Sequence, residues 1–186
     1  MAPTQAIDFG ALVPIPTGIN PGLTAASQSA MLAAFGKPGQ LTTECSPVTN
    51  AALAKLMVTT NVGPFMVHGL KPAVEALARV FADIKAHKPD VHAALTTAGM
   101  TCCRAVRGSK TNFSNHSWGT AIDLSIHGHL TPLGSPTVQR GMVEAAPFFA
   151  KEKFFWGAGF HTRADGMHFE ASNELLHDWK AHGKIP

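Results

Sequence analysis

The chain has 186 residues, of which 45% are hydrophobic and 15% charged, and its formal net charge is +3. This length and composition are typical of a single globular domain with a substantial core. The charge is mild and no run of Lys and Arg marks a nucleic-acid patch, so we expect no nucleic-acid partner.

The beginning of the chain gives no sign of a membrane segment. Residues 1–10 contain no basic stretch followed by an apolar one, so they do not form a Sec-type signal peptide. The apolar run at residues 30–35 is too short to span a bilayer. We therefore expect synthesis in the cytoplasm without stable membrane insertion. Residues 1–20 are punctuated by Pro and Gly and are expected to form an extended arm of the domain.

The three cysteines are too few for a disulfide scaffold, and their number is odd. Cys102 and Cys103 are adjacent, so on a strand their thiols would point to opposite faces and could not chelate together. The favoured interpretation is that all three are core thiols. A bridge from Cys45 to one of the other two is the alternative.

Three helices are predicted in the first half of the chain. The first covers about residues 25–35, with Thr24 as N-cap and Gly36 at its end. The second follows Thr49 and has Leu53, Leu56 and Met57 on one face. The third covers about residues 72–86, because its apolar residues recur at helical spacing. These residues are Val74, Leu77, Phe81 and Ile84.

Strands are predicted on either side of a loop in the middle of the chain. One covers residues 97–104 and the other residues 120–126. In the second strand Ile122, Leu124 and Ile126 alternate with smaller or polar residues, which predicts a core face and a face that borders a cleft. Asp123 belongs to the cleft face.

The last third of the chain is predicted to contain two helices and a short strand. The first helix covers about residues 138–153 and is bent or broken at Pro147. An aromatic strand or loop follows at residues 154–160. Residues 167–170 form the short strand after a turn at Asp165-Gly166, and a helix over residues 173–180 is capped by Ser172.

Two stretches carry the residues for chemistry. Ser114-Asn115-His116-Ser117-Trp118-Gly119-Thr120-Ala121-Ile122-Asp123 contains an imidazole and a carboxylate, and Asp165-Gly166-Met167-His168-Phe169-Glu170 adds a second imidazole. Two His and one Asp fill three positions of a tetrahedral zinc site and leave the fourth free, which is the arrangement of a catalytic site. Gly119 allows a tight backbone turn between His116 and Asp123.

The spacing Ser-x-His-x-x-Gly-x-Ala-x-Asp, followed by Asp-x-x-His, resembles the zinc D-alanyl-D-alanine carboxypeptidases. Their superfamily (peptidase family M15, with the hedgehog/DD-peptidase fold) also contains phage L-alanyl-D-glutamate endopeptidases and the hedgehog signalling domain. The resemblance covers about residues 63–179. It implies an α+β fold in which a small antiparallel sheet carries the zinc and helices pack on one side.

The resemblance also implies a role for each motif residue. His116, Asp123 and His168 would bind one zinc ion, and Asp165 would be the general base. Arg104 would hold substrate and polarise its carbonyl, with Arg107 as the alternative for this role. Arg107, Ser114 and Trp156 would also contact substrate, although a core position for Trp156 is equally favoured. Glu170 shares a face with His168 by the two-residue period of a strand and is expected to orient that ligand from behind.

The function implied is that of a zinc peptidase that hydrolyses peptidoglycan stem peptides, using a zinc-activated water and Asp165 as base. We expect a monomer that reaches the cell wall after release or delivery, and the absence of a Sec-type signal fits a lysis enzyme, a delivered effector or a cytoplasmic enzyme equally. The sequence leaves open whether it is a carboxypeptidase or an endopeptidase. The alternatives are a binding or signalling domain with a silent zinc site and, less favoured, a metal-dependent nuclease.

Overall fold

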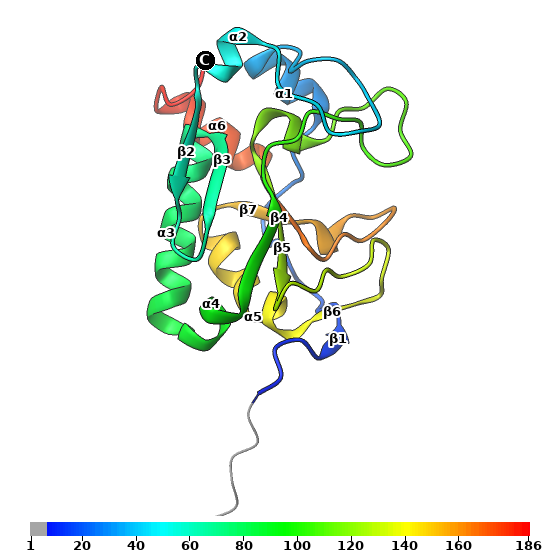
Figure 1. The fold of residues 1–186 in the computed structure, drawn as a ribbon, viewed down its shortest axis with the longest axis vertical. Helices are drawn as coiled ribbons and strands as arrows, with labels where there is room; N and C mark the ends of the chain where they lie inside the picture. Colours follow the sequence, from blue (N-terminus) through cyan, green and yellow to red (C-terminus); the bar gives the residue numbers. More distant parts are fainter. Residues whose placement is uncertain (1–6) are drawn as a thin grey trace, which may run out of the picture.

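The computed structural model describes residues 7–186 and has the predicted α+β fold (Figure 1). Part of the predicted arm, residues 1–6, lies outside the described residues. The rest of it contains strand β1 (Leu12–Pro14), which pairs antiparallel with β6 (Thr137–Gln139). Within the described part of the chain, every helix is too short or too polar to cross a membrane.

A four-stranded antiparallel sheet forms the centre of the molecule. Its strands lie in the order β4 (Leu95–Gly99), β5 (Ala121–Ile126), β8 (His168–Ala171) and β7 (Phe154–Trp156). In the register of β5 and β8, Asp123 lies directly opposite His168. Residues opposite each other in an antiparallel pair project from the same face. The two motifs therefore meet on one face of this sheet.

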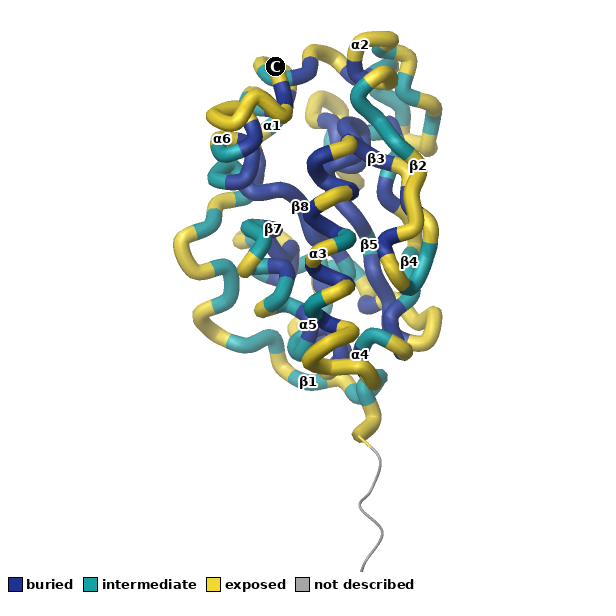
Figure 2. The backbone as a smooth tube through the Cα atoms, turned by 90° about the vertical axis from the view of Figure 1, so that its left-hand side faces the viewer, coloured by how far each residue is buried: buried dark blue, intermediate teal, exposed yellow. Residues whose placement is uncertain are grey.

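Three helices cover the other face: α3 (Lys71–His87), α4 (Pro89–Ala94) and α5 (Arg140–Lys151). Figure 2 shows α3 in front of the buried strands β5 and β8. The four residues of the predicted α3 stripe are all buried. The Phe81 ring of α3 packs edge-on against Phe149 of α5 at 5.8 Å, and Phe149 stacks on Phe169 of β8 at 4.0 Å. An aromatic core thus supports the strand that carries His168.

Helix α5 differs from its prediction in two ways. It begins at Arg140 because Val138 belongs to strand β6, and it continues without a break through Pro147 to Lys151. Pro147 is exposed. The carbonyl that loses its intrahelical partner to the proline therefore lies on the solvent side of the helix, where water can satisfy it.

Among the predicted helices, the second differs most from the structure. Helix α2 covers only Ala51–Ala54, and Met57 is the first residue of strand β2 (Met57–Asn61). Strand β2 forms a hairpin with β3 (Met66–Leu70), which was not predicted. The stripe through Leu53, Leu56 and Met57 is therefore wrong, because the β-branched residues that follow Met57 favour a strand.

The terminal helices lie close to their predicted bounds. Helix α1 covers Gln28–Phe35 and ends at Gly36 as predicted, but its N-cap is Ser27, whose hydroxyl accepts from the amide of Ala30. Helix α6 covers Asn173–Ala181, and Ser172 caps it as predicted. Both helices lie at the same end of the molecule in Figure 1, beside the C-terminus.

Candidate metal centre

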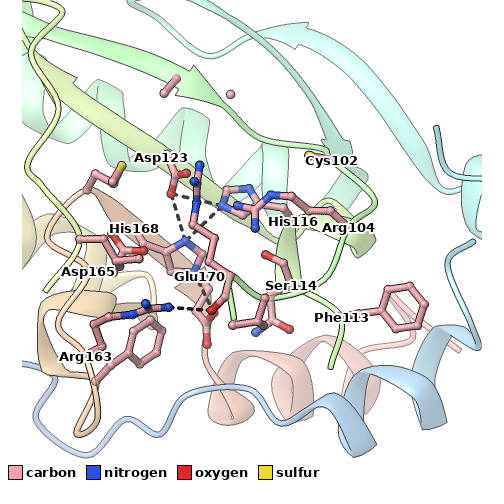
Figure 3. A pocket seen from close by; sticks show the side chains of 18 of the residues that line it. Cys102, Arg104, Phe113, Ser114, His116, Asp123, Arg163, Asp165, His168 and Glu170 are labelled. Atoms are coloured by element: carbon pink, nitrogen blue, oxygen red, sulfur yellow. Dashed lines mark hydrogen bonds and ion pairs between the residues drawn. The ribbon is translucent and has the colours of Figure 1, made fainter. Parts of the chain in front are cut away.

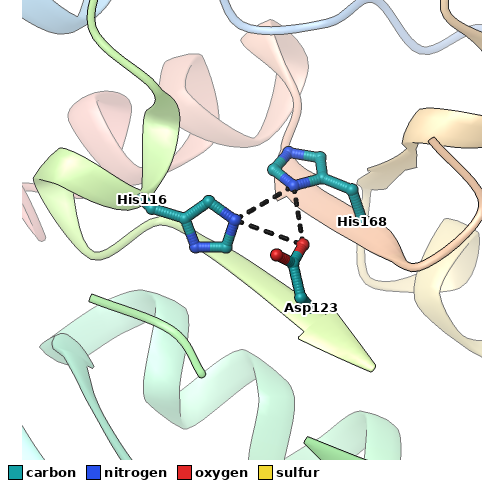
Figure 4. A group of neighbouring side chains, drawn as sticks. All are labelled: His116, Asp123 and His168. Carbon is teal, nitrogen blue, oxygen red and sulfur yellow. Dashed lines mark hydrogen bonds and ion pairs between the residues drawn. The ribbon is translucent and has the colours of Figure 1, made fainter. Parts of the chain in front are cut away.

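The three predicted ligands form a compact triangle (Figure 4). His116 lies in the short 3-10 helix η1 (Asn115–Trp118), Asp123 in β5, and His168 at the start of β8. His116 Nε2 is 3.1 Å from His168 Nδ1, and Asp123 Oδ1 is 3.2 Å and 3.0 Å from these two nitrogens. Both imidazoles are buried.

The backbone at Gly119 brings η1 against the rest of the site. Gly119 has φ of 64°, and its carbonyl accepts from the amide of Leu70 at 2.9 Å. A Cβ at this position would lie 2.8 Å from Leu70 N and 2.9 Å from Gly69 Cα. The predicted requirement for glycine is therefore confirmed, because both the left-handed conformation and the close approach exclude a side chain.

The outer nitrogen of each imidazole has its own acceptor. His116 Nδ1 donates to the carbonyl of Met100 at 2.6 Å, and His168 Nε2 donates to Glu170 Oε2 at 2.9 Å. The inner nitrogens therefore carry lone pairs in the neutral rings. Two lone pairs and a carboxylate oxygen converge on one point, which is unfavourable unless a positive charge lies between them.

A metal ion fits this donor set. Donors about 2.1 Å from a tetrahedral ion lie roughly 3.4 Å apart, close to the separations observed. Two imidazole nitrogens and a carboxylate oxygen also suit zinc, and the hydrogen bonds to Met100 and Glu170 are those that orient metal-binding imidazoles.

The pKa values of the cluster also indicate that a positive charge is favourable between these groups. Burial disfavours the charged form of both groups, but their mutual contacts outweigh it. The contacts with His116 and His168 hold the pKa of Asp123 well below its ordinary value. The contacts with Asp123 and Glu170 raise the pKa of His168 to about 10. Without a metal, a proton on His168 supplies the positive charge.

Asp165 borders the same cavity as the triad (Figure 3). The amide of His168 donates to the carbonyl of Asp165 at 3.2 Å, which closes the predicted turn. Among the described residues, Asp165 Oδ1 is buried without a hydrogen-bond partner. Burial raises the pKa of this carboxyl, and the negative charge of Asp123 adds to the effect.

Glu170 lies behind His168, on the face of β8 that the strand period predicts. Besides Oε2 on His168, its Oε1 accepts from the amide of Ala26 at 3.2 Å. Glu170 is 4% exposed, so these two contacts hold a carboxylate that water hardly reaches.

A cavity of about 1250 Å³ surrounds the site. Arg104, Arg107 and Ser114 line it, and their contact with substrate stays a prediction. Arg104 Nη1 donates to the carbonyl of Ala105 at 3.0 Å, and the carbonyl of Arg104 accepts from the amide of Ser114. Strand β4 ends at Gly99, so Arg104 lies in an irregular segment and not at a strand end as predicted.

Trp156 does not line the cavity, which corrects its prediction as a substrate contact. It is 2% exposed, and its ring stacks on Phe169 in the core. The pairing of β7 with β8 places Trp156 opposite Phe169, which faces away from His168. Its Nε1 donates to the carbonyl of Gly166 at 2.9 Å. The indole therefore supports the turn that carries Asp165.

The cysteines also differ from the favoured interpretation. Cys45 and Cys102 form a disulfide that borders the cavity, so the alternative bridge is the correct one for these two. Cys103 is free and buried.

Two further residues at the site, Arg163 and Phe160, were not predicted. Arg163 Nη2 donates to the carbonyl of Arg107 at 2.7 Å, and the Phe160 ring lies 5.7 Å from that of His168.

Comparison with known proteins agrees with the geometry. The sequence model of a family described as D-alanyl-D-alanine carboxypeptidase matches residues 107–171. This range contains the triad, Asp165 and Glu170, but not Arg104. No curated protein and no solved structure matches the chain significantly. Residues 107–171, which contain the triad, are therefore similar to the peptidase family of the D-alanyl-D-alanine carboxypeptidases.

Proposed function

We propose that this protein is a zinc-dependent peptidase that hydrolyses peptidoglycan stem peptides. The observation that carries the proposal is the convergence of three acceptor atoms, from His116, Asp123 and His168, on the wall of a large cavity that also contains Asp165. A bound zinc ion would lower the pKa of a water molecule and polarise the scissile carbonyl.

Asp165 is the proposed general base. Asp165 is half-buried next to the triad, its Oδ1 is buried without a hydrogen bond to another described residue, and the pKa of its carboxyl is raised. A raised pKa makes the carboxylate a better proton acceptor, provided that it stays ionised at the working pH. Asp165 takes the proton of the attacking water and delivers it to the leaving amine.

Arg104 is the proposed partner of the substrate carbonyl. Its guanidinium borders the cavity, and its one hydrogen bond to the described residues leaves most of its N–H groups free. A fixed cation at this point stabilises the negative charge that develops on the carbonyl oxygen. Arg107 and Ser114 line the same cavity and are proposed to contact the peptide on either side of the bond.

The test uses purified peptidoglycan, with products identified by mass spectrometry and metal measured by elemental analysis. The wild type should contain one zinc per chain and release peptides or amino acids from the wall. His168→Ala should lose most of the zinc and all activity. Asp165→Asn should keep the zinc and lose at least ~100-fold in kcat, the usual scale for removal of a general base.

His161→Ala is the matched control, because His161 also lines the cavity but does not belong to the triad. It should keep both zinc and activity. Full zinc occupancy in His168→Ala would refute the ligand set. A zinc-loaded wild type that releases nothing from any wall or muropeptide would instead indicate a binding domain of the same fold. The mass of the products distinguishes a carboxypeptidase from an endopeptidase.

A further inference from the structure

A segment far from the two motifs touches the back of the metal site. Residues 20–28, here called the strap, run from β7 past the end of β8 to the start of α6. Asn20 exchanges two hydrogen bonds with the backbone of Trp156, at 2.7 and 2.9 Å. Thr24 donates twice to Glu174, at 2.8 Å each. The strap also forms an isolated antiparallel bridge between Ala25 and Ser172.

Ala26 is the residue of the strap that reaches the metal site. Its amide donates to Glu170 Oε1 at 3.2 Å, and its carbonyl accepts from Asn115 Nδ2 at 3.1 Å. The other oxygen of Glu170 accepts from His168 Nε2. Asn115 precedes the ligand His116 and is 9% exposed. A continuous buried path thus runs from Asn115 through Ala26 and Glu170 to His168.

This path determines which nitrogen His168 offers to a metal. A carboxylate on Nε2 keeps the proton there and leaves Nδ1 for the ion. Glu170 can hold this position only while its second oxygen is also satisfied, because a buried carboxylate with one unpaired oxygen would rotate toward another hydrogen-bond donor. The amide of Ala26 satisfies that oxygen, and Asn115 keeps this amide in place.

We propose that Asn115 is a positioning residue of the metal centre, and that it acts on His168 through the strap and Glu170. The proposal rests on the metal site of the proposed function but not on its substrate. It also assigns a role to the strap, which lies outside residues 107–171 of the family match.

The test is a double-mutant cycle on zinc affinity, measured by competition with a chromophoric chelator. Asn115→Ala removes the donor to Ala26 and should weaken zinc binding about 10- to 100-fold, the range for outer contacts of metal ligands. Glu170→Gln should weaken it similarly. If Asn115 acts through Glu170, the double variant should bind zinc as weakly as Glu170→Gln alone. Additive losses would overturn the proposal.

Two further variants separate an effect on zinc binding from an effect on folding. Asn115→Asp has nearly the size of the wild type but no N–H donor, so it should show the same loss even if Asn115→Ala folds poorly. Asn20→Ala removes two strap contacts remote from Glu170 and serves as a control for stability. It should lower the melting temperature but leave zinc affinity within about twofold. An equal loss of affinity in Asn20→Ala, or none in Asn115→Asp, would contradict the proposal. A wild type that binds no zinc would instead refute the proposed function.

Discussion

Asp165 is a residue whose proposed role opposes the stability of the fold. Its carboxylate is partly desolvated, and among the described residues Oδ1 has no hydrogen-bond partner. The folded state therefore binds the proton of this carboxyl more tightly than the unfolded state, as its raised pKa indicates. Such a group contributes stability below its unfolded pKa, and that contribution is lost as the pH rises through its folded pKa.

We predict that Asp165→Asn stabilises the metal-free protein while it removes activity. Near neutral pH the charge on Asp165 costs stability, and a neutral amide of the same size avoids that cost. A gain of about 1 kcal/mol, the scale of one unsatisfied buried group, corresponds to roughly 2–4 °C in melting temperature. Thermal unfolding in chelator should show this gain at pH 7 and its disappearance near pH 3. A less stable Asn variant at pH 7 would contradict the assignment.

The residues of the metal site were more predictable than those of the cavity around it. His116, Asp123 and His168 lie in short motifs whose spacing and strand period are visible in the sequence. Trp156 was misplaced because an aromatic residue next to a site fits the core as well as the cleft. Arg163 was not found, because its contact with Arg107 joins two irregular loops that no sequence pattern pairs.

At the scale of elements, the contact between β3 and η1 sets the position of His116. Gly69 and Gly119 bring two backbones together without side chains, and a Cβ on Gly69 would lie 2.9 Å from the carbonyl oxygen of Gly119. The first motif is thereby fixed to a hairpin that carries none of the motif residues.

We predict that Gly119→Ala destabilises the protein by about 3 kcal/mol and weakens zinc binding. The change adds the strain of a left-handed alanine to a clash with the backbone of Gly69 and Leu70. Gly128→Ala is the matched control, because Gly128 has φ of 79° but open space around its Cβ position. It should cost only the strain, about 1–2 kcal/mol. Chemical denaturation of both variants measures the difference, and equal losses would show that the close approach does not matter.

Elements with a clear period were predicted well, and the hairpin near the middle of the first half of the chain was not. The stripe of α3 and the alternation of β5 each extend over enough residues to identify the element. The hairpin of β2 and β3 was missed because apolar and polar residues do not alternate along the sequences of its strands. The hairpin also packs against α3, a tertiary contact that no local sequence pattern shows.

At the scale of the whole molecule, the disulfide between Cys45 and Cys102 joins two segments of the cavity wall. It closes a loop with a sequence separation of 57, and the amide of Cys102 donates to the carbonyl of His116 at 3.0 Å. The bridge therefore restrains the chain next to a metal ligand. The sequence offered this pairing only as an alternative, because no local pattern shows which distant thiols meet.

We predict that reduction lowers the stability of the protein by up to about 4 kcal/mol, the chain-entropy value for a loop of this length. This corresponds to a drop of roughly 10 °C in melting temperature. The double variant Cys45→Ser/Cys102→Ser should show the same drop and no further response to dithiothreitol. Cys103→Ala, which leaves the bridge intact, should still respond to dithiothreitol. A wild type that is insensitive to the reductant would contradict the prediction.

The contacts of the strap have a consequence for the order in which parts of the protein fold during synthesis. The bond from Ala26 to Glu170 joins residues 144 apart, and the bonds from Thr24 to Glu174 join residues 150 apart. During synthesis the strap cannot make these bonds until the chain up to Glu174 has left the ribosome. Pairings this distant in sequence form slowly. The metal centre is therefore completed at the end of folding, and a nascent chain that stops short of β8 has no finished site in which to hold an ion.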